Sequence, residues 1–512
     1  MKKGIKKAGA MTLAVSMLAA GLAGCGGGSA SDNDSAKTDA DINEVQETNK
    51  GDSTESGEIV KLRVWGFAYT ATSEECAAVA EAVSEITRDK IGVEVELVRN
   101  SDGEKLNLAL TSGEQLDLVN FHTYAGGLGA LVTNGMAMPI DDLAKEYAQE
   151  AIDLVGEDML VAGKVNGALY SIPNVNDYAN GYGIAMRKDV LDDLGIDAET
   201  IKTEEDIHEV LVRVKEERSD LYPLVPTWGG GGMQRGFAFD SLGTGFWDAC
   251  GVLENVFDDS TTVVNLYETD SYREFCERMY EWNKEGLVML DATTFNEANP
   301  CATVGFADFD NNKPTKESEL RRDWKHDGKI ISLVEPFMTS DVGDSSFFIP
   351  SVCEHPEKAM QLWNLMFTDP EISNLFVNGI EGKNYTYIDD TKQVIQQMPE
   401  STYDIQAWSW PNARLTPVYE GDDLDKWEQA AAFNDSARRS PALGFRFDSS
   451  SVVNELTACS NVISKYEVGL RWGVLNPDEA LPKFNEELKA AGIDTIIAEK
   501  QKQLDAFLAE NK

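Results

Sequence analysis

The spacing of apolar residues at the start of the folded region predicts a β-α-β unit. Leu62 and Val64 are the apolar members of a short buried strand within residues 61–69. Residues 73–88 repeat apolar positions at near-helical spacing, and residues 93–98 return to a strand pattern. We therefore expect an α/β protein, in which ligands bind beyond the carboxyl ends of the strands.

Aromatic residues follow two of the predicted strands. Trp65, Phe67 and Tyr69 lie at the end of the first strand, and His122 and Tyr124 follow a buried strand over residues 116–121. If these strands are sheet neighbours, their ends converge on one face, where Trp65 would stack on a ligand and the polar groups would hydrogen-bond it. The alternative is that Trp65 and Phe67 pack in the core.

The pattern beyond this unit alternates between strands and helices. Val165-Asn166-Gly167 is a hairpin signal, and residues 181–189 form a strand that enters a helix at 190–195. A capping-box pattern begins at Thr203. Further helices are expected over residues 270–286, 356–367, 369–379, 452–466 and 479–511. The chain is thus predicted to be α/β overall, with a helical C-terminal region.

Residues 1–24 have the pattern of a secretory signal. A lysine-rich start precedes an apolar stretch over residues 11–22 that is too short to span a bilayer. The sequence Leu22-Ala23-Gly24-Cys25 resembles the lipobox of bacterial lipoproteins. The resemblance implies cleavage before Cys25 and acyl chains on that residue, which would anchor the protein at the extracellular face of the cell membrane. An ordinary secretory peptide is the alternative, and it would leave Cys25 as a free thiol.

A flexible acidic linker is expected between Cys25 and residue 58. This stretch is rich in Gly, Ser, Asp, Asn, Thr and Glu and has too few apolar residues to form a core. A random coil of this length reaches about 30 Å, at ~5–6 Å times the square root of the residue number. The linker would therefore let a folded domain stand away from the membrane.

The composition of the chain limits the kinds of partner that the protein can bind. Apolar residues make up 42% of the chain, which is typical of a globular protein, and the formal net charge is −43. Such a field repels nucleic acid and anionic lipid surfaces, so we expect neither as a partner. No second long apolar run follows the signal.

Cysteine and histidine spacing predicts no metal or cofactor. Six cysteines follow Cys25 without any C-x-x-C pair, and we favour free, buried thiols, with a disulfide as the alternative. The four histidines lack the spacing of zinc ligands. Asp308, Asp310 and Glu319 echo a calcium-binding EF-hand loop, but Lys313 occupies the position where the turn needs glycine.

The sequence contains no recognisable catalytic motif. There is no G-x-S-x-G elbow and no H-E-x-x-H helix, and the glycines at 229–232 lack the Lys-Ser/Thr of a phosphate-binding loop. No catalytic constellation is therefore apparent, and we do not expect an enzyme.

Short stretches spread along residues 60–512 share one resemblance. They are residues 104–107, 112–117, 165–174, 186–189, 355–360, 368–371, 379–385, 444–448, 491–494 and 501–505. Together they resemble the carbohydrate-type extracellular solute-binding lipoproteins of bacterial ABC importers. The C-terminal stretches are similar to one large subgroup, often assigned to the uptake of oligosaccharides, including aldouronates.

This resemblance implies the type II periplasmic-binding-protein fold, in which two α/β lobes close on a ligand. Lobe I would span residues 59–178 with a return segment at about 345–400. Lobe II would span residues 179–344 with the helical region at about 401–512. Crossing segments between the lobes are expected near residues 178–183 and 345–350.

The resemblance also implies ligand contacts. Aromatic rings stack on sugar faces, and a few polar groups bind the hydroxyls. Besides the five residues at the two strand ends, the predicted ligand-binding residues are Asn174, Tyr182, Trp228, Trp247, Glu381, Trp408, Trp410 and Arg414. Core packing is the alternative for each tryptophan.

The function implied is that of a monomeric substrate-binding component of an ABC transporter. It would capture an extracellular carbohydrate, an oligosaccharide in this subgroup, and deliver it to the transmembrane subunits of a permease. Two alternatives remain: a surface-anchored polysaccharide hydrolase, and a binding protein for a peptide or another non-sugar solute. Binding without turnover separates the hydrolase from the others.

Overall fold

The computed structural model describes residues 59–67, 70–100, 103–121, 127–176, 178–226, 237–243, 249–295, 297–343, 345–403 and 407–510. Only the backbone is described for Phe67, Asn100, Gly103 and Glu104. The predictions for the signal, Cys25 and the linker lie outside these ranges.

The first sheet contains the predicted β-α-β unit. Its strand order is β10-β3-β1-β2. β1 (Val60–Phe67) pairs in parallel with β2 (Val93–Asn100) and with β3 (Leu118–Asn120), and β10 (Phe347–Phe348) is antiparallel to β3. The helix α1 (Ser73–Ile91) connects β1 to β2 and begins with a capping box between Thr72 and Glu75.

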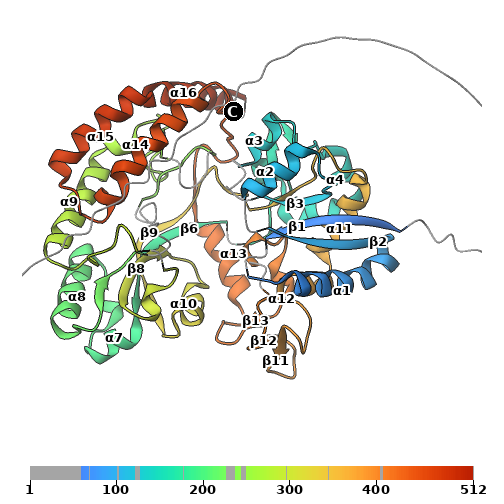
Figure 1. Ribbon diagram of the computed structural model, residues 1–512, viewed down its shortest axis with the longest axis horizontal. Helices are drawn as coiled ribbons and strands as arrows, with labels where there is room; N and C mark the ends of the chain where they lie inside the picture. The colour runs from blue at the N-terminus through green and yellow to red at the C-terminus, as the bar shows by residue number, and fades with distance from the viewer. Residues whose placement is uncertain are drawn as a thin grey trace, which may run out of the picture. The chain divides into compact units, whose positions relative to one another are not determined.

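Alternation along β1 sends its side chains to two different cores. Leu62 and Val64 join a core with α1 and the helices α4 (Asp141–Tyr147), α5 (Gln149–Val155), α6 (Glu157–Leu160), α11 (Pro356–Thr368) and α12 (Pro370–Asn378). Trp65 faces the other way, into a core with α2 (Gly103–Ser112) and α3 (Gly127–Thr133). The sheet thus has helices on both faces (Figure 1).

The predicted hairpin is confirmed between β4 (Lys164–Val165) and β5 (Ala168–Leu169). Asn166 and Gly167 have φ angles of 50° and 82°. A two-residue turn with both φ angles positive matches the twist of the flanking strands, and Asn-Gly is the sequence that best tolerates it.

A second, five-stranded sheet has the order β14-β9-β6-β8-β7. Its central strand β6 (Asn180–Arg187) is antiparallel to both β8 (Gly305–Asn311) and β9 (Gly328–Met338). The edge strands are β7 (Tyr222–Leu224) and β14 (Arg438–Arg439). Its helices are α7 (Lys188–Asp193), α8 (Glu204–Glu217), α9 (Asp270–Lys284) and α10 (Lys316–Trp324).

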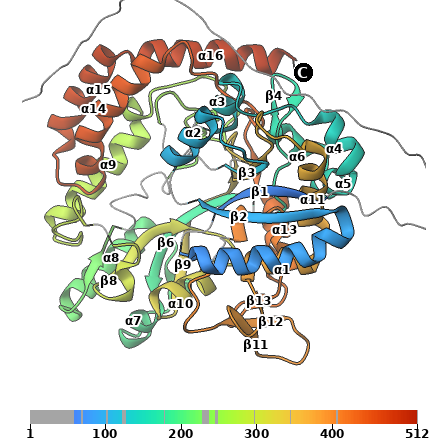
Figure 2. The same cartoon turned by 45° about the vertical axis from the view of Figure 1, so that its right-hand side comes forward.

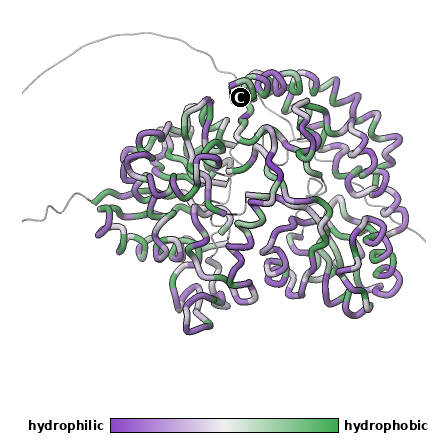
Figure 3. Tube along the Cα trace, turned by 180° about the vertical axis from the view of Figure 1, so that it is seen from behind, coloured by the Kyte–Doolittle hydropathy of each residue, from purple (hydrophilic) through white to green (hydrophobic). Residues whose placement is uncertain are grey.

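The C-terminal region is helical, as predicted, and packs with the second sheet's core. α14 (Val453–Arg471) and α15 (Pro477–Ala491) lie beside α9, as Figures 1 and 2 both show. Gly492, with a φ angle of 103°, separates α15 from α16 (Ile493–Glu510), so the described part of the single helical stretch predicted from residue 479 forms two helices. Hydrophilic and hydrophobic positions alternate along these helices (Figure 3), which is typical of helices with one buried face.

A small third sheet was not predicted from the sequence. It consists of β11 (Tyr385–Tyr387), β12 (Val394–Gln397) and β13 (Val418–Tyr419), and α13 (Lys426–Ser436) follows it. Within this region Tyr403 and Trp410 pack in the core of the first sheet. The lobe boundary near residue 400 therefore remains a prediction. None of the helices in the described part of the chain is long and apolar enough to cross a membrane.

Candidate ligand-binding site

The two strand ends that were expected to converge do lie next to each other. β1 and β3 are paired neighbours, with Trp65 opposite Val119. The convergence of the side chains themselves remains a prediction. Tyr69, His122 and Tyr124 lie outside the described residues, and only the backbone of Phe67 is described.

Trp65 is a core residue in this structure. Its side chain is 6% exposed and packs in the cluster that contains Leu106, Val119 and Phe348. Its buried Nε1 has no hydrogen-bond partner among the described atoms. This is the packing alternative that the sequence left open, and contact between Trp65 and a ligand remains a prediction.

Asn174 and Tyr182 lie where the chain passes from the first sheet to the second. Asn174 donates from Nδ2 to the carbonyl of Ser345 at 2.9 Å and accepts at Oδ1 from Ser346 at 3.3 Å. Because both ends of its amide are used and it is buried, Asn174 ties the outgoing segment to the returning one. Tyr182 is buried edge-on against Phe337, with ring centroids 5.4 Å apart.

The chain also crosses between the sheets after Trp410, a passage that the sequence did not predict. Trp410 is buried in the first core, and β14, further along the chain, pairs with β9 of the second sheet. On the way, Asn434 of α13 accepts at Oδ1 from the amides of Tyr178 and Ala179, at 2.8 and 3.0 Å. Its Nδ2 donates to the carbonyl of Asn176 at 2.8 Å. The outgoing and last crossings are thus hydrogen-bonded to each other.

The two candidate tryptophans that the structure describes differ in burial. Trp410 is 1% exposed and packs against Phe376 and Phe347. Trp408 is only partly buried, and its backbone carbonyl accepts from Asn176 Nδ2 at 2.6 Å. Trp228 and Trp247 are among the residues that are not described.

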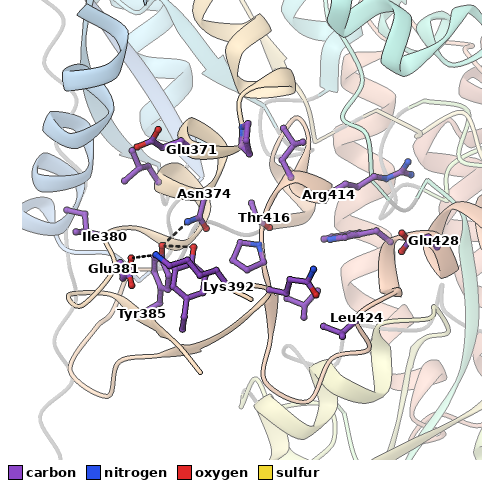
Figure 4. Close-up of a pocket in the computed structure, with 18 of the residues that line it drawn as sticks. Glu371, Asn374, Ile380, Glu381, Tyr385, Lys392, Arg414, Thr416, Leu424 and Glu428 are labelled. Carbon is purple, nitrogen blue, oxygen red and sulfur yellow. Dashed lines mark hydrogen bonds and ion pairs between the residues drawn. The ribbon is translucent and has the colours of Figure 1, made fainter. Parts of the chain in front are cut away.

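The structure does bring Glu381 and Arg414 together, in a cavity of about 880 Å³ between α12, the β11–β13 sheet and α13 (Figure 4). Sequence reasoning missed the aromatic and amide residues of this cavity. Trp427, in a polar stretch, was the one with a recognisable signal. The lining residues are Pro370, Glu371, Asn374, Leu375, Ile380, Glu381, Tyr385, Tyr387, Lys392, Gln393, Arg414, Leu415, Thr416, Pro417, Val418, Leu424, Trp427, Glu428 and Ala431.

Polar contacts order one side of this cavity. Lys392 Nζ lies 3.3 Å from Glu381 Oε2 and 4.9 Å from the centroid of the Tyr387 ring. Asn374 Nδ2 donates to the Tyr385 hydroxyl at 2.8 Å. Burial raises the pKa of Tyr385, so its hydroxyl stays protonated at neutral pH. The cavity therefore offers both donors and acceptors beside aromatic rings.

Arg414 connects the cavity to the crossing segments. Its Nη2 donates to the carbonyl of Asn176 at 3.4 Å, the same oxygen that accepts from Asn434. Its Nε is buried and has no hydrogen-bond partner within the described structure. Arg414 is thus a lining residue that also contacts the backbone of the outgoing crossing.

The EF-hand-like sequence does not form a loop. Asp308 and Asp310 lie on β8, and α10 begins at Lys316. Lys313 pairs with Glu319 at 2.9 Å, and Lys316 pairs with Asp310 at 3.2 Å. Lysine ammoniums thus lie against these carboxylates. No group of three or more His, Cys, Asp or Glu side chains placed to hold a metal occurs in the described ranges.

Of the six cysteines after Cys25, five are buried, and Cys353 is partly buried and donates from Sγ to Asp117 Oδ1 at 3.3 Å. The prediction of free thiols is confirmed for Cys76, Cys276, Cys301 and Cys353. Burial raises the pKa of Cys276 to about 12 and that of Cys353 to about 12. Both thiols are therefore protonated, and poor nucleophiles, at neutral pH.

Sequence comparison relates the chain to two families. Residues 81–380 match the family described as bacterial extracellular solute-binding protein. Residues 441–509 match a domain of unknown function (DUF3502), which covers α14 to α16. A protein of Streptococcus pneumoniae serotype 4 named carbohydrate ABC transporter substrate-binding protein is 25% identical over 84% of this chain and 87% of its own length.

Solved structures establish the fold. The N-glycan transport solute-binding protein of Streptococcus pneumoniae has a TM-score of 0.77 and 23% identity, over 89% of this chain and all of that one. A solute-binding protein of Bifidobacterium longum infantis, described as binding HMO, has a TM-score of 0.58 and 14% identity, over 88% and 99% of the two chains. The predicted two-lobe fold with a helical C-terminal region is confirmed.

Proposed function

The chain belongs to the family of bacterial extracellular solute-binding proteins, and we propose that it is the carbohydrate-binding component of an ABC transporter. It captures an extracellular oligosaccharide between its two lobes and delivers it to the transmembrane subunits of a permease. It binds its ligand without chemical turnover.

The observation that carries this proposal is the family match over residues 81–380 on a two-sheet architecture with crossing segments. Two further observations support it. The Streptococcus relative that spans most of the chain is named for carbohydrate transport, and one neighbouring structure is described as a complex with Man5GlcNAc. Because a ligand between lobes contacts both only when they approach, it favours the closed arrangement.

We place the ligand at the carboxyl edge of the first sheet and on the facing part of the second lobe. The proposed contacts are Trp65, Phe67, Tyr69, His122, Tyr124, Trp228, Trp247 and Trp408. Asn174, Tyr182 and Trp410 are buried, and we propose that they hold the crossing segments and the core. The proposed lobe boundaries are those stated from the sequence.

Calorimetry on the full chain with a panel of neutral and acidic oligosaccharides tests this function. We expect one sugar class to bind, the sugar to be recovered intact by chromatography, and the radius of gyration to fall when ligand is added. Release of shorter sugars would support the hydrolase, and binding of peptides alone would refute the carbohydrate assignment.

We propose that Cys25 carries a lipid anchor and that residues 26–58 tether a monomer outside the cell. A Cys25→Ala variant should leave the membrane fraction or remain unprocessed, because no thiol is available for acylation. Immunoblots of membrane and medium fractions measure this. A variant that is fully cleaved and still sediments with membranes would contradict the anchor.

A further inference from the structure

The cavity of Figure 4 is separate from the edge of the first sheet. Among the residues that the structure describes, those that line the cavity all lie between Pro370 and Ala431, and none belongs to β1 or β3. The contacts proposed above and the described lining of this cavity therefore have no residue in common. Figure 4 shows Glu381, Tyr385 and Lys392 on one side of the cavity and Leu424 and Glu428 on the other.

One wall of the cavity is part of the first lobe's core. Ile372 and Phe376 of α12 are fully buried in the core that contains β1 and α1. Asp369 caps α12 and forms an ion pair with Lys90 at the end of α1. This wall, which carries Glu371 and Asn374, therefore moves with the first sheet.

The opposite wall is bonded to the second sheet. Asp422, with a side chain only 1% exposed, accepts from Arg322 Nη1 at 2.7 Å and from Lys426 Nζ at 2.6 Å. Arg322 belongs to α10, which packs on β9, and α13 also contacts β9. The segment that presents Trp427 and Glu428 thus follows the second sheet, and a molecule in the cavity would contact elements of both lobes.

The charges of the lining favour an uncharged ligand. The described lining carries the carboxylates of Glu371, Glu381 and Glu428 and the cations of Lys392 and Arg414, and the Glu381–Lys392 pair cancels one charge of each sign. A strong anion would meet carboxylates, and a strong cation would meet the guanidinium and the ammonium. Neither sign dominates, in a chain whose overall charge is strongly negative.

The rings and polar groups of the cavity suit a ligand that has many hydroxyls and apolar faces. Tyr387 and Trp427 are partly buried, and each has a lysine ammonium within 5 Å of its ring centroid, at 4.9 Å and 4.7 Å. Carboxylate and amide groups stand beside these rings to accept from and donate to hydroxyls. A few polar groups among aromatic side chains, in a volume within the ~300–1,000 Å³ usual for small-molecule sites, suit a small sugar.

We propose that this cavity is a second saccharide-binding site, which takes an uncharged mono- or disaccharide and is separate from the ligand site of the proposed function. The bound sugar stacks on Tyr387 and Trp427, and Glu371, Asn374 and Glu428 bind its hydroxyls. The proposal concerns the cavity alone and does not depend on which oligosaccharide the transporter imports.

Calorimetric titration of the full chain with glucose, mannose, xylose, N-acetylglucosamine and their disaccharides tests the site. Tyr387→Ala and Trp427→Ala each remove one ring of the cavity. The matched control is Tyr280→Ala, since Tyr280 is equally partly buried and has Lys284 Nζ 5.2 Å from its ring, on α9 away from the cavity. Ala431→Phe fills the cavity without deleting a packed side chain. It therefore still tests the site if Tyr387→Ala or Trp427→Ala fails to fold.

We expect a neutral sugar to bind in two events per chain, or in one event beyond that of the transported oligosaccharide. The cavity variants should weaken one event at least tenfold and leave the other within twofold, and Tyr280→Ala should change neither. A single event in the wild-type chain, or two events unchanged in all cavity variants, would overturn the second site while leaving the proposed function standing. Loss of every event in the cavity variants would also overturn it, because the cavity would then belong to the main site.

Discussion

Replacing Trp410 by alanine tests whether this side chain packs in the core or stacks on the ligand. Trp410 is 1% exposed, and its ring lies 4.7 Å from Phe376 at an interplanar angle of 33° and 5.9 Å from Phe347 at 85°. Both neighbours belong to the same core as β1, α11 and α12. The substitution would therefore open a cavity where the last crossing segment leaves the first lobe.

The expected cost follows from this packing. Removing a buried tryptophan side chain lowers the free energy of unfolding by about 3–5 kcal/mol, which includes the lost transfer energy and the cavity. Nε1 of Trp410 has no hydrogen-bond partner among the described residues, so no broken hydrogen bond adds to this value. We expect no change in the affinity of the folded protein for its sugar.

Urea denaturation followed by circular dichroism measures the change in unfolding free energy, and calorimetry on the folded chain measures affinity. Trp408→Ala is the matched control. Trp408 lies two residues away and is only partly buried, and its backbone carbonyl keeps the hydrogen bond from Asn176. Its loss should cost no more than about 1.5 kcal/mol, the lower end for full burial of a large apolar side chain.

A small loss of stability together with weaker binding would refute this reasoning. If Trp410→Ala unfolds within about 1 kcal/mol of the wild-type chain, the ring does not fill a core of the size that such substitutions normally reveal. If the same variant binds its sugar at least tenfold more weakly, Trp410 returns to the ligand site.

Two further predictions concern pH and backbone fit. Burial alone would raise the pKa of Glu75, but hydrogen bonds from Thr72 and Thr402 outweigh it and hold the pKa at about 2. At pH values above 4.5, the ordinary pKa of this carboxyl, the ionised side chain therefore stabilises the fold. This contribution should disappear as the pH falls from about 4.5 to about 2. Melting temperatures across this range should fall more steeply for the wild-type chain than for Glu75→Gln, and parallel curves would contradict the assignment. Gly473→Ala should lower the free energy of unfolding by about 1–3 kcal/mol, because its Cβ would lie 2.0 Å from the carbonyl oxygen of Met279 on α9. Gly135→Ala is the control for urea denaturation, since Gly135 has a similar positive φ and open space around it, and equal losses in both variants would assign the cost to φ alone.

Elements whose formation depends on local spacing were predictable. The β1-α1-β2 unit follows from apolar periodicity and a capping box, and the β4–β5 hairpin follows from Asn166-Gly167. These features need only neighbouring residues. The β11–β13 sheet was missed because strands of two to four residues carry no periodic signal.

Which residues line a site was decided by contacts between distant parts of the chain. Trp408 and Trp410 are equally good ring platforms by composition, yet one is partly exposed and the other is buried against Phe376 and Phe347. Packing against Phe376 of α12 and Phe347 of β10, both far from residue 410 in the sequence, makes that distinction. Burial depends on elements far away in the sequence, and spacing between near neighbours does not encode it.

The sequence by itself determined the fold class, the hairpin, the ends of several helices and the resemblance that led to a solute-binding protein. The tertiary structure decided that β1 and β3 are neighbours, that Glu381 and Arg414 share a cavity, and that Asp422 ties one wall of that cavity to Arg322 of α10. The physical reason is the distance along the chain over which each kind of interaction acts. Dihedral preferences and periodicity act over a few residues, whereas a cavity forms where helices and strands separated by tens or hundreds of residues pack without filling the space between them.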